Sequence, residues 1–506
     1  MSRKAAAAKI AITGIISSLI IAVFGFFVQK AFVNTLGVEV SGLNGVFTNI
    51  ISVLTMADFG VSTAIVFNLY KPLAKGDKSK IAALMQYYHK CCLVIGALIL
   101  AGGLLLLPFL SLIIKEETPT VNIYIAFSLF VCNALFSYVL NYKRVLLQAD
   151  QKSTKINLVV SAVSLVSYSA KLFVLYKFNN FYLFILCNVV AKIIEDLIIW
   201  KIVDKIYPYI HKKKQLDKST KADITKKIKA SVPHNISSYV VYSTDSLLLT
   251  YFFGSFQTGL YVNYSMIISA INIITNNLSN AVSAGMGNIL AKEGRDYLFV
   301  NTKRLSLFNY WVYATISIAL YFCASYFIRL WLGEDLFLSD ITVAAIVINF
   351  FLNGIRAPAN SALSAAGILH ENRFVPVAEA IINLTASIIL AKLIGVPGIF
   401  IGTIISTLYQ HLYNYPKYAY ELVFKQPRYL YLVSFSKKLI GFFACAIATF
   451  FIINLLPEEN SPFIGFIRNG AISCLVPSLL ILLTTAKTPE FKYFHNLVCS
   501  KLFHTR

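Results

Sequence analysis

Apolar stretches of about 20 residues follow one another along almost the whole chain, and each is long enough to cross a hydrocarbon core as a helix. In lipid such long runs satisfy their backbone hydrogen bonds only as helices. The composition agrees, because 57% of the 506 residues are hydrophobic and 13% are charged, about half the charged fraction of an ordinary soluble protein. The sequence therefore predicts an all-α polytopic membrane protein.

These stretches predict 14 transmembrane helices. The expected helices lie near residues 10–34, 41–70, 91–114, 121–142, 156–176, 180–203, 233–253, 259–288, 306–331, 341–366, 375–395, 397–416, 439–456 and 465–486. Every connection expected on the outer side is short, so the sequence predicts no catalytic domain outside the membrane.

A segment near the N-terminus recurs later in the chain, without a gap, at an offset of 217 residues. The identical pairs include Gly37 and Gly254, Gly42 and Gly259, Leu43 and Leu260, Ala64 and Ala281, and Lys75 and Lys292. Six predicted helices separate equivalent positions, and because six is an even number both copies must have the same orientation in the membrane. The sequence therefore predicts two six-helix lobes related by a parallel 6+6 repeat, an architecture typical of secondary transporters.

The longest hydrophilic segment, residues 204–232, falls between the sixth and seventh predicted helices. It predicts a basic cytoplasmic linker between an N-terminal lobe at 1–203 and a C-terminal lobe at 233–416. Two further helices and a cytoplasmic tail occupy 417–506, outside the 6+6 scheme.

Lysine and arginine residues are concentrated on one side of the predicted topology. With both termini placed in the cytoplasm, most of them fall in cytoplasmic segments, and the outer loops hold little beyond Lys115 and Lys177. This positive-inside bias predicts cytoplasmic termini. The net charge of +22 then reflects topology and contact with anionic membrane lipids, so we expect no nucleic-acid partner.

The motifs of common enzymes and cofactor sites are missing from the sequence. There is no G-x-x-x-x-G-K-[ST] segment for nucleotide hydrolysis, no H-E-x-x-H pair for zinc and no C-x-x-C pair among the eight cysteines. We therefore expect no cofactor, no metal and no enzymatic activity.

Hydroxyl and amide side chains follow one face of the predicted helix 259–288. The face includes Ser265, Ser269, Asn272 and Asn276. Their spacing of four, three and four residues keeps them on a narrow stripe. The repeat carries the stripe in the predicted helix 41–70, as Thr48, Ser52 and Thr55. Equivalent polar faces are expected if both helices line a central aqueous cavity; the alternative is close helix packing, which small and hydroxyl residues also mediate in lipid.

Several ionisable side chains lie at membrane depth, where a charge is costly unless it faces protein or water. Asp245 shares one face of the predicted helix 233–253 with Asn235 and Tyr242. Lys30 and Lys171 lie within about two turns of outer helix ends, where a long side chain can either face a cavity or extend to the interface. We expect these residues to be candidates for substrate contact.

Arg356 lies near the middle of the predicted helix 341–366 and cannot easily reach water. Its guanidinium suits a phosphate or diphosphate through bidentate contacts. The alternative is a buried ion pair with Glu379 or Asp245.

Several motifs occur together along the chain. They are LGVEVSGLNGVF (36–47), DFGVSTA (58–64), LYKPLAKGD (69–77), LLQADQK (146–152), DSLLLTYFFGSFQTGLYVNYSMII (245–268), AGMGN (284–288) and a run of positions from Arg356 to Thr403. With them the chain resembles the Wzx-type flippases, the polysaccharide biosynthesis proteins of the multidrug/oligosaccharidyl-lipid/polysaccharide flippase superfamily. The resemblance covers roughly the first twelve predicted helices and implies a V-shaped, MATE-like fold with alternating access.

The resemblance also implies a function. Proteins of this family move oligosaccharide repeat units on undecaprenyl diphosphate from the inner to the outer leaflet of the bacterial cytoplasmic (inner) membrane. The units serve the biosynthesis of surface polysaccharide, such as the O-antigen of lipopolysaccharide, capsule or exopolysaccharide. The implied partners are the lipid-linked substrate, membrane lipids, a polysaccharide polymerase and glycosyltransferases.

Two other functions compete with this interpretation. A cation-coupled multidrug or metabolite exporter of the same superfamily would use Asp58 and Asp245 as coupling carboxylates. A membrane glycosyltransferase or polymerase would need acidic catalytic residues, usually on a sizeable aqueous loop, and every expected outer loop is short.

Overall fold

The computed structural model describes residues 3–58, 60–115, 121–212, 214–283, 286–333, 336–368, 371–457 and 461–503. For the helical residues 3–12, 227, 229–242, 277–283, 288 and 498–503 it describes the backbone alone. Within these ranges the regular structure is helical, without a β-strand. The all-α class predicted from the apolar stretches is confirmed.

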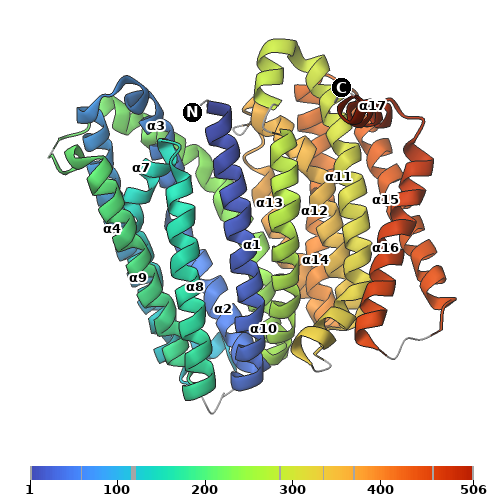
Figure 1. The fold of residues 1–506 in the computed structure, drawn as a ribbon, viewed down its shortest axis with the longest axis horizontal. Helices are drawn as coiled ribbons and strands as arrows, with labels where there is room; N and C mark the ends of the chain where they lie inside the picture. The colour runs from blue at the N-terminus through green and yellow to red at the C-terminus, as the bar shows by residue number, and fades with distance from the viewer. Residues whose placement is uncertain are drawn as a thin grey trace. The chain divides into compact units, whose positions relative to one another are not determined.

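The chain divides into two compact units, Met1–Ile273 and Ile274–Arg506, coloured in chain order in Figure 1. The first unit contains α1 (Arg3–Leu36), α2 (Val38–Leu54), η1 (Thr55–Asp58), α3 (Val61–Lys75), α4 (Lys78–Leu106), η2 (Leu107–Phe109), α5 (Leu110–Ile113), α6 (Ile123–Val139), η3 (Asn141–Lys143), α7 (Arg144–Ala149), α8 (Ser153–Phe178), α9 (Phe181–Ile206), η4 (Pro208–His211) and most of α10 (Lys218–Ser283). The second contains the end of α10, α11 (Met286–Leu332), α12 (Asp340–Ala366), α13 (Val375–Ile394), α14 (Val396–Tyr409), the π-helix η5 (Gln410–Val423), α15 (Arg428–Asn454), α16 (Pro462–Thr485) and α17 (Pro489–Phe503). The lobe boundary predicted within 204–232 rests on the hydrophilic segment there and stays a prediction.

Two clusters of buried apolar side chains form the core of the first unit. One surrounds Phe32, Phe47 and Phe127 and joins α1, α2 and α6 to neighbouring ends of α8 and α9. The other surrounds Leu69 and Met85 and joins α3, α4 and α7 to the opposite ends of α8 and α9. Burial of this apolar surface holds both ends of the helices together.

In the second unit α12 is the most enclosed of the candidate membrane spans, with 61% of its most apolar stretch buried. It lies beside α11 and α14. Phe351 of α12 stacks on Phe442 of α15 with ring centroids 4.1 Å apart. Figure 1 shows α11, α12, α15 and α16 as long neighbouring helices of this unit.

Ten helices in the described part of the chain are long and apolar enough to cross a membrane. Large apolar side chains such as Val166 and Leu393, each 71% exposed, lie on their outer faces as expected for contact with lipid. The protein is therefore a multi-pass membrane protein, although the predicted count of 14 spans is not confirmed. α9 carries several charges around Glu195, so it is not apolar enough to count as a span. α14 has 14 residues before the π-helix begins, so it is too short to count.

Several elements differ from the sequence predictions, and four of them begin well before the predicted helix: α4 at Lys78, α10 at Lys218, α11 at Met286 and α15 at Arg428. The predicted helix 41–70 is interrupted, because α2 gives way to η1 and α3 begins only after Gly60, which has a left-handed φ of 80°. The predicted helix 397–416 passes into η5 and extends to Val423. α17 lies in the tail, where the sequence predicts no span. Its residues are less apolar than those of the spans.

Candidate functional site

The two copies of the sequence repeat pack against each other within the first unit. A Cβ atom built on Gly42 would lie 1.9 Å from the carbonyl oxygen of Ser255, and one on Gly259 would lie 2.1 Å from that of Val38. Gly42 and Gly259 are equivalent in the repeat, and so are Val38 and Ser255. The contact between α2 and the second copy in α10 is therefore reciprocal, and only glycine allows the two backbones to come this close.

The backbone conformation also repeats. Gly37 precedes α2 with φ 88° and ψ 166°, and its equivalent Gly254 interrupts α10 with φ 85° and ψ 171°. Few residues other than glycine adopt these angles. α10 thus consists of two helices joined at Gly254. The junction falls between the predicted helices 233–253 and 259–288, but the first helix begins earlier, at Lys218, inside the predicted linker 204–232.

Buried polar side chains that sequence reasoning missed lie near this crossing. Gln29 of α1 donates hydrogen bonds to Oγ of Ser41, at 2.8 Å, and to Oδ1 of Asn263, at 3.0 Å. One amide therefore links both copies of the repeat. The hydroxyls of Thr250 and Thr258 lie 2.7 Å apart. The available signal was an amide within an apolar helix, which needs a polar partner in lipid.

The two polar stripes are not buried in the described part of the chain. Thr48, Ser269 and Asn276 are exposed, and Ser52, Thr55, Ser265 and Asn272 are half-buried. The hydroxyl of Thr48 donates to the carbonyl of Asn44 at 2.7 Å, and that of Ser52 donates to the carbonyl of Thr48 at 2.8 Å. The hydroxyls of Thr55 and Ser265 likewise donate within their own helices. Cavity lining by these stripes stays a prediction.

Lys171 of α8 does not extend to the membrane interface, because the residue is only 7% exposed. Its Nζ atom lies 5.1 Å from the ring centroids of both Tyr168 and Phe184. It borders a cavity of about 230 Å³ between α6, α8 and α9, which Asn133 and Glu195 also line. Among the described residues no carboxylate pairs with this ammonium group.

The other predicted site residues of the first unit differ in their surroundings. Asp245 is 6% exposed and so is well buried in α10. Lys30 is half-buried on α1. The side chains of Asn235 and Tyr242 lie outside the described residues.

Arg356 and Glu379 form a buried ion pair between α12 and α13. Nη1 of Arg356 lies 3.1 Å from Oε1 of Glu379, and the two side chains are 17% and 10% exposed. The second carboxylate oxygen accepts a hydrogen bond from Gln410 at 2.6 Å, and Gln410 in turn accepts one from Asn414 at 2.6 Å. The ion pair considered as an alternative is thus present. A guanidinium has five donors, so pairing with Glu379 does not exclude a phosphate contact.

The fold is similar to those of solved transporters. The lipid II flippase MurJ, in an inward closed conformation, matches with a TM-score of 0.65 and 15% identity over 96% of this chain and 100% of that one. An inward-facing multidrug resistance MATE family transporter of the MOP superfamily matches with a TM-score of 0.62 and 12% identity over 79% and 94%. A mutant of the Vibrio cholerae MATE transporter VcmN matches with a TM-score of 0.58 and 16% identity over 80% and 97%. Identities this low show a shared fold, and the expected MATE-like fold is confirmed.

The sequence comparison gives the family. No curated protein matches this chain. The family model described as "Polysaccharide biosynthesis protein" matches residues 7–284, which is more than half of the chain. The matched region contains both copies of the repeat up to the end of α10. The chain therefore belongs to the polysaccharide biosynthesis protein family.

Proposed function

We propose that this protein is a flippase for undecaprenyl-diphosphate-linked oligosaccharide repeat units. It moves them by alternating access from the inner to the outer leaflet of the bacterial cytoplasmic membrane, with both of its termini in the cytoplasm. The observation that carries the proposal is the family match over residues 7–284, and the fold shared with a lipid II flippase supports it. The translocated units serve surface polysaccharides such as O-antigen, capsule or exopolysaccharide, after glycosyltransferases have built them and before a polymerase joins them.

In this proposal the substrate divides between two environments. The polyprenyl tail stays in lipid, and the diphosphate and glycan occupy a polar cleft lined by the two stripes, which carry Thr48 and Ser269. Arg356 contacts the phosphates, and Lys30 and Lys171 add positive charge. The exposure of Thr48 and Ser269 supports this role, because side chains used only for helix packing would be buried.

Deletion of the gene tests the function in cells. We expect surface polysaccharide to be lost and lipid-linked repeat units to accumulate in the inner leaflet, where an impermeant glycosidase or lectin added outside cannot reach them. Re-expression of the wild-type chain should restore both. Normal polysaccharide together with normal precursor topology would remove the proposal.

A cation-coupled exporter is the second candidate, because solved structures with this fold include multidrug resistance transporters. The buried carboxylate of Asp245 is the residue that favours it. Proteoliposomes under an imposed proton or sodium gradient should then show cation-dependent efflux of a drug or metabolite, and Asp245→Asn should abolish this efflux. Unchanged efflux with and without the gradient counts against the exporter.

A further inference from the structure

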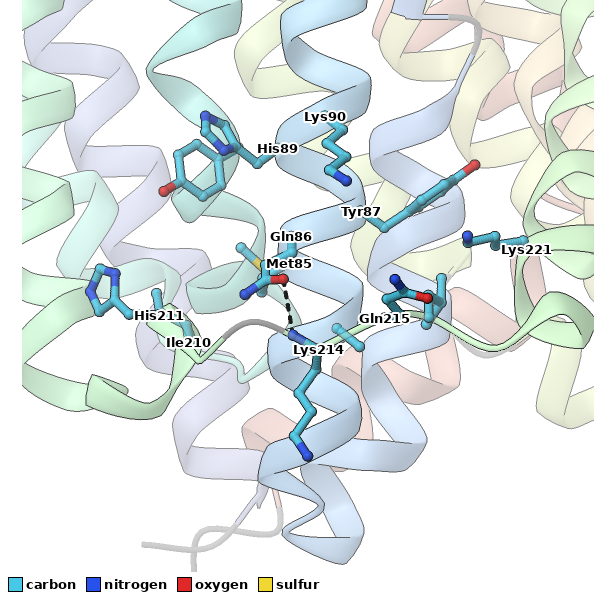
Figure 2. A pocket seen from close by; sticks show the side chains of 13 residues that line it. Met85, Gln86, Tyr87, His89, Lys90, Ile210, His211, Lys214, Gln215 and Lys221 are labelled. Carbon is cyan, nitrogen blue, oxygen red and sulfur yellow. Dashed lines mark hydrogen bonds between the residues drawn. The ribbon is translucent and has the colours of Figure 1, made fainter.

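A basic pocket lies at one end of the first unit, between α4 and the segment that connects α9 to α10. It has a volume of about 1050 Å³. Thirteen residues line it, and none of them is acidic. They come from α4, η3, η4, the connecting segment and the first turn of α10 (Figure 2). This volume is just above the usual range for small-molecule sites, roughly 300–1,000 Å³.

Three lysines give the basic pocket its charge. Figure 2 shows Lys90 on α4 and Lys221 near the start of α10, and Lys214 on the connecting segment with its side chain extending away from both. All three are exposed, so a ligand can reach their ammonium groups from solvent. Among the described residues no carboxylate forms an ion pair with any of them. The imidazoles of His89 and His211 complete the nitrogen-bearing lining.

Two carboxylates next to the basic pocket form ion pairs with lysines outside its lining. Asp204 lies 2.6 Å from Nζ of Lys143, which is nearly fully buried, and 3.1 Å from Nε2 of His211. Asp217 lies 3.7 Å from Nζ of Lys80. Neither Lys143 nor Lys80 lines the pocket. These pairs offset the nearby negative charge, so the positive charge of the lining lysines is left for a ligand.

Local hydrogen bonds fix the lining in place. The amide of Gln86 donates to the carbonyl of Lys212 at 2.6 Å and accepts from the backbone N–H of Lys214 at 3.1 Å, which ties the connecting segment to α4. Asp217 caps α10 by accepting from the backbone N–H of Thr220 at 2.8 Å. Hydrogen bonds from Ser219 and Thr220 hold the pKa of Asp217 well below its usual value, so the cap stays charged. Lys221 follows this cap and is positioned by it.

We propose that the basic pocket binds a phosphate-bearing anion, with a diphosphate as the chemistry that fits it. The ammonium groups of the lining lysines can donate charge-assisted hydrogen bonds to phosphate oxygens. The diphosphate can belong to a soluble molecule or to a lipid headgroup, and the recognition chemistry is the same. The site is distinct from the membrane-embedded residues of the proposed function, so it can be tested without a transport assay.

Calorimetric titration of the purified full-length protein in non-ionic detergent tests the proposal. Inorganic pyrophosphate and farnesyl diphosphate are the two probes. We expect saturable binding that weakens at higher salt, and a loss of about tenfold in affinity for each of Lys90→Gln, Lys214→Gln and Lys221→Gln. Equal affinity for both probes assigns the pocket to soluble diphosphates, and preference for farnesyl diphosphate assigns it to a lipid headgroup.

Tryptophan fluorescence locates the binding independently. The chain has three tryptophans, and the ring of Trp200 lies 5.5 Å from that of Tyr142, which lines the basic pocket. Pyrophosphate should therefore change the emission of the wild-type protein but not that of Trp200→Phe.

Lys226→Gln is the matched control, because Lys226 is an exposed lysine of α10 outside the lining. It should bind like the wild type. Absence of saturable binding, or equal weakening by Lys226→Gln and Lys221→Gln, would overturn the proposal. Thermal unfolding of each variant shows that a loss of binding is not a loss of fold.

Discussion

At the scale of single residues, the Arg356–Glu379 pair allows a structural role to be separated from a substrate role. Arg356→Gln leaves the buried Glu379 carboxylate without its cation. We expect the free energy of unfolding to fall by roughly 3 kcal/mol, as when one partner of a buried ion pair is removed. Denaturant unfolding of the purified variant in detergent measures this.

The double variant Arg356→Gln with Glu379→Gln distinguishes the two roles. It removes both charges together, so most of the lost stability should return. Flipping of the lipid-linked substrate should remain lost, because the proposed phosphate contact is still missing. If flipping recovers together with stability, Arg356 is structural and does not belong to the substrate site.

Lys171, also a single residue, should behave differently from Arg356: its replacement should leave stability unchanged. Its ammonium is buried beside two aromatic rings, and no described carboxylate compensates its charge. Lys171→Met keeps the volume and removes a costly charge, so we expect the free energy of unfolding to stay within about 1 kcal/mol of wild type or to rise. If the ammonium contacts the substrate, the flipping rate should fall at least about tenfold, the worth of one charge-assisted hydrogen bond. Strong destabilisation without an effect on flipping would assign Lys171 to the fold alone.

At the scale of elements, the reciprocal contact between the repeat copies depends on two glycines. Gly42→Ala and Gly259→Ala each place a methyl group against a backbone carbonyl that cannot rotate away. Each should lower the free energy of unfolding by about 1–3 kcal/mol, the usual cost of overpacking. The two losses should be similar, since the contacts are equivalent by the repeat.

The control for this prediction is Gly287→Ala in α11, where an added Cβ meets nothing within 4 Å. It should leave the unfolding midpoint unchanged or raise it slightly, because alanine favours a helix over glycine. A wild-type midpoint for both Gly42→Ala and Gly259→Ala would contradict the prediction, because α2 and α10 would then accommodate the added methyl groups without a loss of stability.

The sequence predicts some elements closely and others poorly. The prediction 341–366 corresponds to α12 (Asp340–Ala366), which begins after Ser339 and ends at Gly367. α12 is predictable because an apolar run and its local caps decide both of its ends. The π-helix at Gln410–Val423 is not, because many of its residues are polar and its form depends on neighbours.

At the scale of the whole molecule, the sequence alone reveals the repeat and the charge bias, from which we predict the lobes and the orientation, because each is a pattern along the chain. Pairings between helices could be predicted only in part: the Arg356–Glu379 ion pair was one of the alternatives that the sequence left open, and it is present. Gln410 lies 31 residues from Glu379, and nothing in the spacing indicates that its amide reaches that carboxylate. Sequence reasoning also left both a cavity and the interface open for Lys171, and only packing shows that the side chain is buried.

Orientation in the membrane is the prediction that involves the whole chain. In a background with the eight native cysteines replaced, Lys177→Cys and Lys218→Cys remove the same charge from exposed positions at the end of α8 and the start of α10. The positive-inside bias places Lys177 outside and Lys218 in the cytoplasm. A membrane-impermeant maleimide should therefore label Lys177→Cys in intact cells and Lys218→Cys only after permeabilisation. The reverse pattern would turn the basic pocket toward the outside, where a substrate made in the cytoplasm could reach it only after translocation.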